Sequence, residues 1–196
     1  MVEESKLAST NVLAFVGSLG SRSANRLALI AAQQLAPSGM QISLADLTPI
    51  PFYNPDDEAE ERLPAAVRAL RAQVAAADGL LFATAEYNHT VPAVLTNMMD
   101  WLSRSSPPPF AGKPAAMFGA ASGQTGTARA QMHLLVIARS LGLLVMPQPE
   151  LYIREAQSKF DAAGRLSDAQ TEAELRSFLT AFDHWLRRLL LGAHRA

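Results

Sequence analysis

The chain alternates short apolar runs with helix-forming stretches, and this alternation constrains its fold more than any other feature. The first run, NVLAFVG, is apolar and ends in glycine, and a helix-forming stretch separates each run from the next. Continuously apolar runs of this length are typical of strands that are buried on both faces of a parallel sheet. The expected strands are residues 11–17, 41–47, 79–84, 114–119 and 143–146, with a continuation of the last through 151–153 left open.

Helical periodicity fills the intervals between these strands. It predicts helices over 25–35, 63–77, 94–103 and 127–141, and a C-terminal amphipathic helix on which Phe178, Phe182, Trp185, Leu186 and Leu189 share one face. Strand–helix alternation of this kind predicts a parallel sheet with helices on both faces. Five such units suit a flavodoxin-like, doubly wound α/β fold with a five-stranded parallel sheet in the order 2-1-3-4-5. Ligands of such sheets bind at the carboxyl ends of the strands where the strand order reverses, so the loops after strands one, three and four form the candidate site.

Length and composition limit the class of protein. A chain of 196 residues with 49% apolar residues suits a single domain, 1–196, around one core. A net charge of −1 disfavours a nucleic-acid partner, and the absence of cysteine excludes disulfides and thiolate catalysis. Residues 1–10, MVEESKLAST, are polar, are expected to be flexible and lack the apolar core of a signal peptide. No apolar run is long enough to cross a membrane, so we expect a cytoplasmic protein with no membrane partner.

The loop after the first expected strand, GSLGSRSANR (17–26), combines glycine, hydroxyl and basic groups and contains no carboxylate. Backbone amides at a helix N-terminus attract anions, and donors such as Ser18, Arg22 and Asn25 can complete a phosphate cradle. The alternative is a glycine–serine turn in which Ser23 caps the next helix. The loop matches neither G-x-x-x-x-G-K-[ST] nor G-x-G-x-x-G, which disfavours a P-loop NTPase and a standard dinucleotide-binding domain.

The loop after the third expected strand places Glu86, Tyr87, Asn88 and His89 side by side in the sequence. Such a polar and aromatic cluster can offer backbone donors and acceptors to a planar heterocycle. The alternative is a simple turn, for which Asn88 is a favourable residue. His89 is a candidate acid or base, although a loop histidine is more often a polar surface residue.

The loop after the fourth expected strand, GAASGQTGTARAQ (119–131), is rich in small residues. Gly123 and Gly126 allow the backbone to approach a ligand closely. By itself this pattern also fits an ordinary strand-to-helix turn.

Other chemistries lack their residues. The four histidines lie far apart in the sequence and form no H-x-x-x-H pair, so no metal site is expected. A response-regulator domain would need acidic residues where this chain has Thr84 and Ala85, and Gly17 and Ser18. A serine hydrolase would need a G-x-S-x-G elbow, which is absent.

Three motifs, taken together, resemble the NADPH-dependent FMN reductase family, which includes bacterial quinone and chromate reductases. They are GSL-x-x-x-S-x-N at 17–25, EYN-x-x-x-P-x-x-L-x-N-x-x-DW-x-SR at 86–104, and GKP followed by a G-x-x-G loop and ARAQ at 112–131. The second motif is long and specific, and the later FDAAGRL (160–166) is also similar to the family. The resemblance extends from about residue 11 to about residue 190.

The resemblance implies a flavodoxin-like domain that holds FMN non-covalently. Its first loop would bind the phosphate, its second loop would line the isoalloxazine ring largely through main-chain atoms, and its third loop would approach the ring from another side. The expected cofactor-binding residues are Ser18, Gly20, Arg22, Ser23, Asn25, Ala85, Glu86, Tyr87, Asn88, Ser122 and Gly123. No side chain is expected to be catalytic, because the flavin carries the chemistry.

Several positions depart from the family pattern, and three of them lie in the candidate cofactor loops. The family often has an arginine directly after GSL, where this chain has Gly20, and we hypothesise that Arg22 replaces it. Ala85 stands where a proline usually precedes EYN, which predicts a less rigid loop. Ala121 stands where a serine often contacts the flavin.

The resemblance implies an enzyme that passes hydride from NADPH or NADH to FMN and on to a small-molecule acceptor. Candidate acceptors are a quinone, free flavin, an azo compound or a metal oxyanion. One alternative is a flavodoxin-like electron carrier without turnover of its own, although a net charge of −1 does not suit charge-steered redox partners. Another is a fold relative that binds a different phosphate ligand or none. The resemblance also implies a homodimer, or a homotetramer, and we expect the dimer to bury the helix that carries Met98, Met99 and Trp101.

Overall fold

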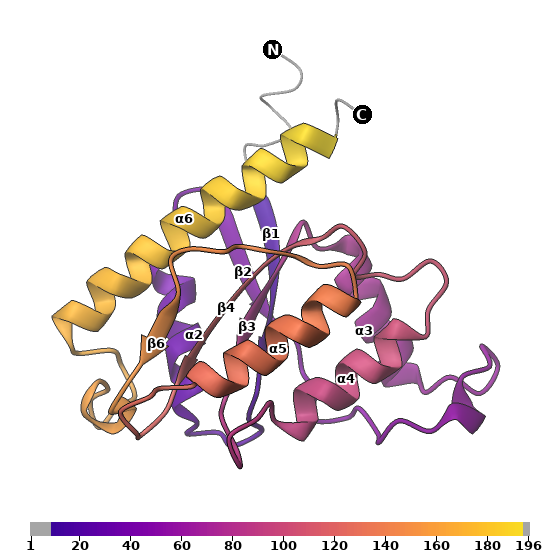
Figure 1. Ribbon diagram of the computed structural model, residues 1–196, viewed down its shortest axis with the longest axis horizontal. Helices are drawn as coiled ribbons and strands as arrows, with labels where there is room; N and C mark the ends of the chain where they lie inside the picture. Colours follow the sequence, from indigo (N-terminus) through magenta and orange to yellow (C-terminus); the bar gives the residue numbers. More distant parts are fainter. Residues whose placement is uncertain (1–8, 194–196) are drawn as a thin grey trace.

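The computed structural model describes residues 9–193 and shows a parallel sheet enclosed by helices (Figure 1). The strand order β2-β1-β3-β4-β5 confirms the predicted flavodoxin-like topology. Of the segment expected to be flexible, 1–10, residues 1–8 lie outside the described residues, whereas Thr10 is buried and already belongs to β1. The strands are β1 (Thr10–Val16), β2 (Met40–Leu44), β3 (Gly79–Ala83), β4 (Pro114–Ala120), β5 (Leu144–Val145) and β6 (Leu151–Ile153).

The edge of the sheet beside β4 differs from the five-stranded prediction. β5 pairs with the start of β4 and β6 pairs with its end, both in parallel, so the edge is made of two short strands. Pro147 and Pro149 lie between them. Proline has no N–H to donate to a ladder, and this explains why the edge strand is interrupted there.

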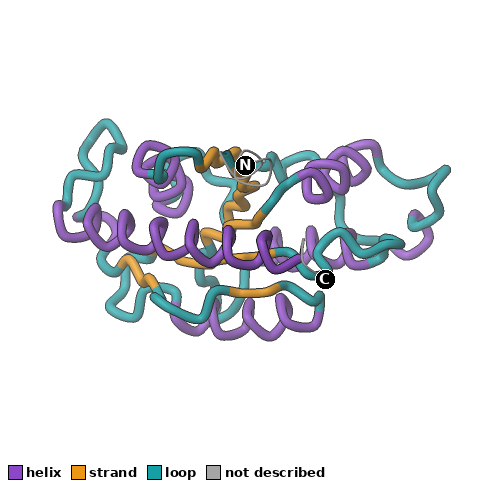
Figure 2. Tube along the Cα trace, turned by 90° about the horizontal axis from the view of Figure 1, so that it is seen from above, coloured by secondary structure: helices purple, strands orange, loops and turns teal. Residues whose placement is uncertain are grey.

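Helices cover both faces of this sheet (Figures 1 and 2). The predicted bounds of the first four helices differ from the observed ones by at most two residues, and Pro92 and Pro64 occupy the N-cap positions of α4 and α3. None of the helices in the described part of the chain is long and apolar enough to span a bilayer. The helices are α2 (Ala24–Leu35), α3 (Ala65–Ala76), α4 (Ala93–Ser103), α5 (Ala128–Ser140) and α6 (Ala169–Ala193), with short 3-10 helices at Pro55–Asp57 and Ala156–Ser158.

Two apolar cores lie on opposite faces of the sheet. On one face, α2 and α6 pack on alternate strand residues, with Phe118 and Phe178 in an edge-to-face contact. On the other face, α3, α4 and α5 pack around Phe15 and Phe82, whose ring centroids are 5.1 Å apart. Each such ring removed from water contributes about 2–3 kcal/mol. All five residues of β3 are buried, as its continuously apolar sequence predicts for a central strand.

The helix expected at a subunit interface, α4, contributes to the interior of the domain: Met98 and Met99 belong to the second core, and Trp101 packs in a smaller cluster with Leu63 and Val67. Met98, Met99 and Trp101 of α4 are each at most 1% exposed within a single chain. The Trp101 Nε1–H donates to the carbonyl of Pro51 at 2.8 Å, which fixes the loop after β2 against α4. Within one chain these three side chains pack in the interior of the domain, and the burial of this helix in a dimer stays a prediction.

Candidate active site

The three predicted loops meet at the carboxyl ends of the neighbouring strands β1, β3 and β4. The chain is in close backbone contact there, because a Cβ added to Gly17 would lie 2.7 Å from the amide nitrogen of Ala85. A Cβ on Gly119 would overlap both the hydroxyl of Thr127 and the carbonyl of Thr84. Glycine at these two positions lets the three loops form one continuous surface.

A side-chain hydrogen bond also joins the first two loops. The hydroxyl of Tyr87 donates to Ser18 Oγ at 3.0 Å across 69 residues of sequence. Tyr87 is 53% exposed, so its ring remains accessible beside the first loop. The structure thus brings together the serine expected at a phosphate and the tyrosine expected near a planar ring.

The first loop presents unused donors at the N-terminus of α2. Ser23 is the N-cap residue, but its side chain makes no capping hydrogen bond, so its hydroxyl is free for a ligand. The Ser23 amide closes a turn with the carbonyl of Gly20 at 3.1 Å, which leaves Ser21 and Arg22 exposed at the tip. Arg26 Nε is buried with no hydrogen-bond partner among the described residues. This donor set fits an anion such as the phosphate of FMN.

Asn25, a predicted phosphate ligand, makes two hydrogen bonds to the end of β4. Its side chain is buried, donates from Nδ2 to the carbonyl of Ala120 at 2.9 Å and accepts the Ala120 amide at 2.8 Å. Both ends of the side-chain amide are therefore engaged with the end of β4. Asn25 joins the first loop to the third, and we assign it a positioning role.

The second loop is a miniature hairpin. The backbone groups of Tyr87 and Thr90 exchange hydrogen bonds of 3.3 and 3.1 Å, and the two residues between them have positive φ angles, 51° for Asn88 and 63° for His89. Two such residues in a two-residue loop are typical of a type I′ turn. Asparagine adopts this conformation readily, whereas histidine does so less often, so contacts elsewhere must hold His89 in place.

Glu86 supplies one of those contacts by reaching from the second loop to α5. Its side chain is 8% exposed, and Oε2 accepts the amides of Arg129 and Ala130 at 3.1 Å each. Oε1 lies 3.5 Å from both His89 Nδ1 and an Arg129 guanidinium nitrogen. Burial alone would raise the pKa of Glu86, but the Ala130 amide, His89 and the Arg129 amide hold it below its usual value. The carboxylate therefore caps α5 from a neighbouring loop, a role for which the sequence carries no local signal.

The third loop rests on the segment that follows β6. The Ala121 amide donates to the carbonyl of Ile153 at 3.0 Å, and the Ala156 amide donates to the carbonyl of Ala121 at the same distance. Ser122 and Gly123 are exposed at the tip of the loop. A Cβ at Gly123 would meet no protein atom within 4 Å, so the protein's own packing does not require glycine there.

A buried polar cluster beneath the third loop is not predicted by the sequence. Thr84, Thr127 and Gln131 are each at most 5% exposed. Gln131 Nε2 lies 3.0 Å from Thr127 Oγ1 and 3.1 Å from the carbonyl of Leu151, so it ties α5 to the strand edge. The cluster fixes the start of α5 and, through Glu86, the second loop.

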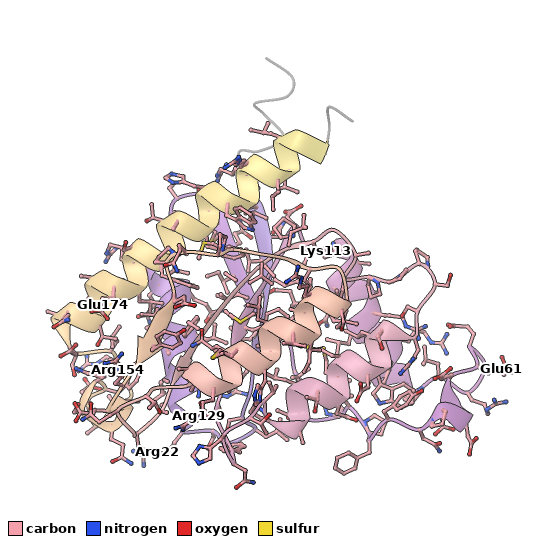
Figure 3. All side chains as sticks on the ribbon, viewed as in Figure 1. Arg22, Glu61, Lys113, Arg129, Arg154 and Glu174 are labelled. Atoms are coloured by element: carbon pink, nitrogen blue, oxygen red, sulfur yellow. The ribbon has the colours of Figure 1, made fainter. Side chains whose placement is uncertain are left out.

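His89 is the candidate acid or base of the second loop, and its side chain points to solvent beside Arg129. The side chain of His89 is 76% exposed, and its Nδ1 lies 2.9 Å from an Arg129 guanidinium nitrogen. Within residues 9–193 no group of three acidic or histidine side chains could hold a metal ion. Arginines do gather here, since Arg22, Arg129 and Arg154 lie at the same end of the molecule in Figure 3.

Comparison with known proteins decides which family this architecture represents. The family model for NADPH-dependent FMN reductase matches residues 10–158, about three quarters of the chain and all three loops. This chain belongs to the NADPH-dependent FMN reductase family. It is therefore an oxidoreductase that works with FMN and NAD(P)H.

Individual FMN reductase relatives match over nearly their whole length. An NAD(P)H-dependent FMN reductase of Pseudomonas aeruginosa, PA1204, is 48% identical over 178 residues, which cover 91% of this chain and 96% of that protein. The quinone reductase of Escherichia coli K12 is 38% identical, again over 91% of this chain and 96% of its own. Among solved structures, the flavoenzyme NAD(P)H:(acceptor) oxidoreductase FerB of Paracoccus denitrificans superposes with a TM-score of 0.85. FerB is 32% identical, and the match covers 91% of this chain and 98% of FerB.

Proposed function

We propose that this protein holds FMN non-covalently in the three loops and transfers hydride from NAD(P)H to a small quinone-type acceptor. The observation that carries this proposal is the unused donor set at the N-terminus of α2, joined by the Tyr87–Ser18 hydrogen bond to the loop that follows β3. A phosphate site and a ring site therefore lie side by side at the strand-order reversal.

Each loop has a separate task in binding the cofactor. Ser18, Arg22 and Ser23 bind the phosphate together with backbone amides, and Gly20 forms the turn that exposes them. Asn25 does not bind the phosphate directly but holds α2 to the third loop.

Main-chain groups of the second and third loops line the isoalloxazine ring. They belong to Ala85, Glu86, Tyr87 and Asn88 in the second loop, and to Ser122 and Gly123 in the third. When bound, FMN supplies the hydride chemistry. The protein fixes the position of the second loop through the two hydrogen bonds that Glu86 accepts from the start of α5.

A quinone is the acceptor class that the relatives favour, since one of them is named quinone reductase. Free flavin, azo compounds and metal oxyanions remain further acceptors to test. Steady oxidation of NADPH by the purified, FMN-loaded protein with a benzoquinone supports the enzyme. Reduction of bound FMN without turnover would instead indicate the electron-carrier alternative.

The proposed role of Arg22 has its own test. Arg22 lies exposed at the tip of the first loop, so Arg22→Ala removes the only charge on that tip without disturbing the core. We expect FMN affinity, measured by quenching of flavin fluorescence, to fall about tenfold, as the loss of one charge-assisted hydrogen bond predicts. Arg139→Ala, at the far end of α5, is the matched control. Equal affinities for Arg22→Ala and Arg139→Ala would remove Arg22 from the site.

The homodimer stays a prediction, as does the cytoplasmic location. We infer that a homodimer would bury α5 rather than the core side of α4. Met132 and Val136 on α5 are 67% and 69% exposed, respectively. Light scattering of the protein and of Val136→Lys tests this inference. A dimer that Val136→Lys leaves intact would place the interface elsewhere.

A further inference from the structure

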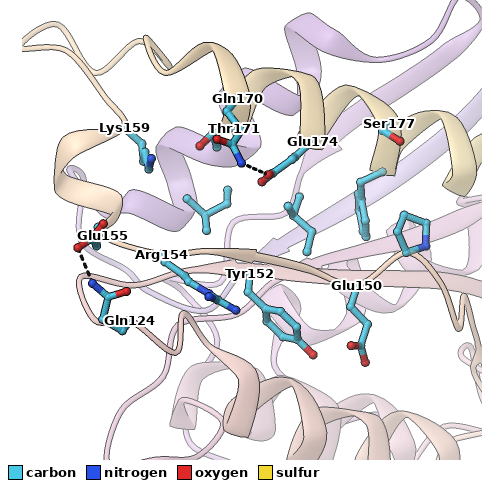
Figure 4. A pocket seen from close by; sticks show the side chains of 14 residues that line it. Gln124, Glu150, Tyr152, Arg154, Glu155, Lys159, Gln170, Thr171, Glu174 and Ser177 are labelled. Carbon is cyan, nitrogen blue, oxygen red and sulfur yellow. Dashed lines mark hydrogen bonds between the residues drawn. The ribbon is translucent and has the colours of Figure 1, made fainter.

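A cavity beside the third loop lies outside the residues assigned to FMN. It has a volume of about 580 Å³, and Figure 4 shows it between α6 on one side and β6 with its following segment on the other. Gln170, Glu174 and Ser177 line it from α6, and Gln124 and Arg154 line it from the opposite side. Its volume lies within the range of small-molecule sites.

The cavity adjoins the third loop, next to the proposed ring site. Gln124, one of its lining residues, directly follows Gly123 in the third loop and donates to Glu155 Oε1 at 2.6 Å. The Glu155 amide donates to the carbonyl of Gly123 at 3.4 Å. Because Gly123 is expected beside the flavin ring, a molecule that lies over the ring can extend past Gln124 into the cavity.

Arg154 is the free cation of this cavity. Its side chain is exposed and makes no hydrogen bond or ion pair with any residue that the structure describes. Four other charged side chains line the cavity. Lys159 lies 3.4 Å from Asp168, Glu174 accepts a hydrogen bond of 2.9 Å from Gln170, Glu155 accepts one from Gln124, and the carboxylate of Glu150 also lines the wall. Glu155, which follows Arg154, has a φ of 49°, a left-handed conformation that in non-glycine residues is often associated with ligand sites.

The lining chemistry fits a nucleoside phosphate. A guanidinium binds phosphate oxygens through paired N–H donors, as Arg154 can. Tyr152 offers aromatic surface to a base. The carboxylate of Glu174 can accept hydrogen bonds from ribose hydroxyls.

We propose that this cavity holds the adenosine half of the NAD(P)H cosubstrate, with Arg154 on its diphosphate. The proposal rests on the proposed function, which places the nicotinamide half over the flavin ring. It makes Arg154 a residue that recognises the cosubstrate and has no part in binding FMN. Arg154 should therefore affect a complete dinucleotide but not a hydride donor that lacks the adenosine half.

The test compares two hydride donors on the FMN-loaded protein. NADPH carries the adenosine half, whereas reduced nicotinamide mononucleotide does not. For Arg154→Ala we expect KM for NADPH to rise about tenfold, the loss of one charge-assisted hydrogen bond, while KM for the mononucleotide stays within about twofold. Arg139→Ala removes an arginine from the C-terminal turn of α5, away from the cavity, and should leave both KM values unchanged.

A second variant probes the space rather than the charge. Ser177→Trp fills the cavity from an exposed position on α6, and Ser177→Ala is its control. We expect Ser177→Trp to raise KM for NADPH and Ser177→Ala to leave it unchanged. Equal losses with both donors, or a raised KM for the quinone alone, would overturn the proposal.

Calorimetric titration with 5′-AMP separates this proposal from the proposed function. Binding by wild type that is lost in Arg154→Ala supports the cavity as a nucleotide site, even if the protein oxidises neither donor. The cavity site is overturned if wild type oxidises both donors but does not bind 5′-AMP, and if Arg154→Ala behaves as wild type does. That result leaves the proposed function standing.

Discussion

Replacing Glu86 tests the link between the second loop and α5. Glu86→Ala removes the acceptor of two helix N-terminal amides, Arg129 and Ala130, from a side chain that is 8% exposed. Loss of a helix cap costs about 0.5–2 kcal/mol, and an amide left without a partner adds to this, so we expect a loss of about 2 kcal/mol. For a chain of this length that corresponds to a Tm lower by roughly 4–8 °C.

The assay is thermal and urea unfolding of the FMN-free protein, followed by circular dichroism, so that cofactor affinity does not enter the result. Glu86→Gln keeps one oxygen acceptor and should lose about half as much. Glu61→Ala, an exposed glutamate far from the site in Figure 3, is the control and should lose less than about 0.5 kcal/mol. A Glu86→Ala protein as stable as Glu61→Ala would refute this link.

The pKa of Glu86 gives the same prediction a pH dependence. Since folding lowers the pKa of Glu86 below the usual value for a glutamate, about 4.3, the carboxylate contributes its full stabilisation at pH values above that usual pKa. The contribution is lost as pH falls through the lowered pKa of the folded state, because the proton then binds both states. The stability difference between wild type and Glu86→Gln should therefore shrink on acidification. A difference that stays constant from pH 7 to about pH 3 would show that the charge of Glu86 plays no part.

The other predictions concern the contacts that join the loops. Gly119→Ala should lose about 3 kcal/mol of unfolding free energy, because its Cβ overlaps Thr127 and Thr84. Gly123→Ala should change stability by less than about 0.5 kcal/mol but should weaken FMN binding. Urea unfolding measures the two stabilities and flavin fluorescence the FMN affinity, and equal stabilities of the two variants would contradict the prediction. Asn25→Ala should lose about 2–3 kcal/mol in the same unfolding assay, because it leaves both polar groups of Ala120 unpaired, and a neutral effect would contradict the bridge. Tyr87→Phe removes an exposed hydrogen bond to Ser18, so stability should change by less than about 0.5 kcal/mol while FMN affinity falls a few-fold; an unchanged affinity would separate Tyr87 from the site.

The sequence predicts the scaffold well because the scaffold depends on local patterns. Alternating strands and helices determine the parallel sheet, its order and the three loops at its carboxyl ends. Asn88 also signals the turn of the second loop, since asparagine tolerates a positive φ. Pro147 and Pro149 favour a break between β5 and β6, because proline cannot donate to a strand ladder. The sequence alone leaves open whether the last strand continues beyond them.

The sequence does not predict roles that depend on distant partners. Asn25 looks like a phosphate ligand by its place in the loop, but its partner Ala120 lies 95 residues away. Glu86 looks like a ring contact, but its carboxylate binds amides that only the packing of α5 brings near. The cavity beside Arg154 likewise exists only because α6 crosses β6. Such contacts follow from tertiary packing, which no local pattern encodes.

The visible spectrum of the purified protein after FMN addition and removal of free flavin tests the central claim most directly. We predict retained flavin absorption near ~450 nm that is bleached by NADPH in the absence of oxygen and restored by a quinone. Retained absorption would establish that the protein holds the cofactor, and bleaching would establish that NADPH reduces it. A protein that neither retains FMN nor oxidises NADPH in its presence would contradict the account.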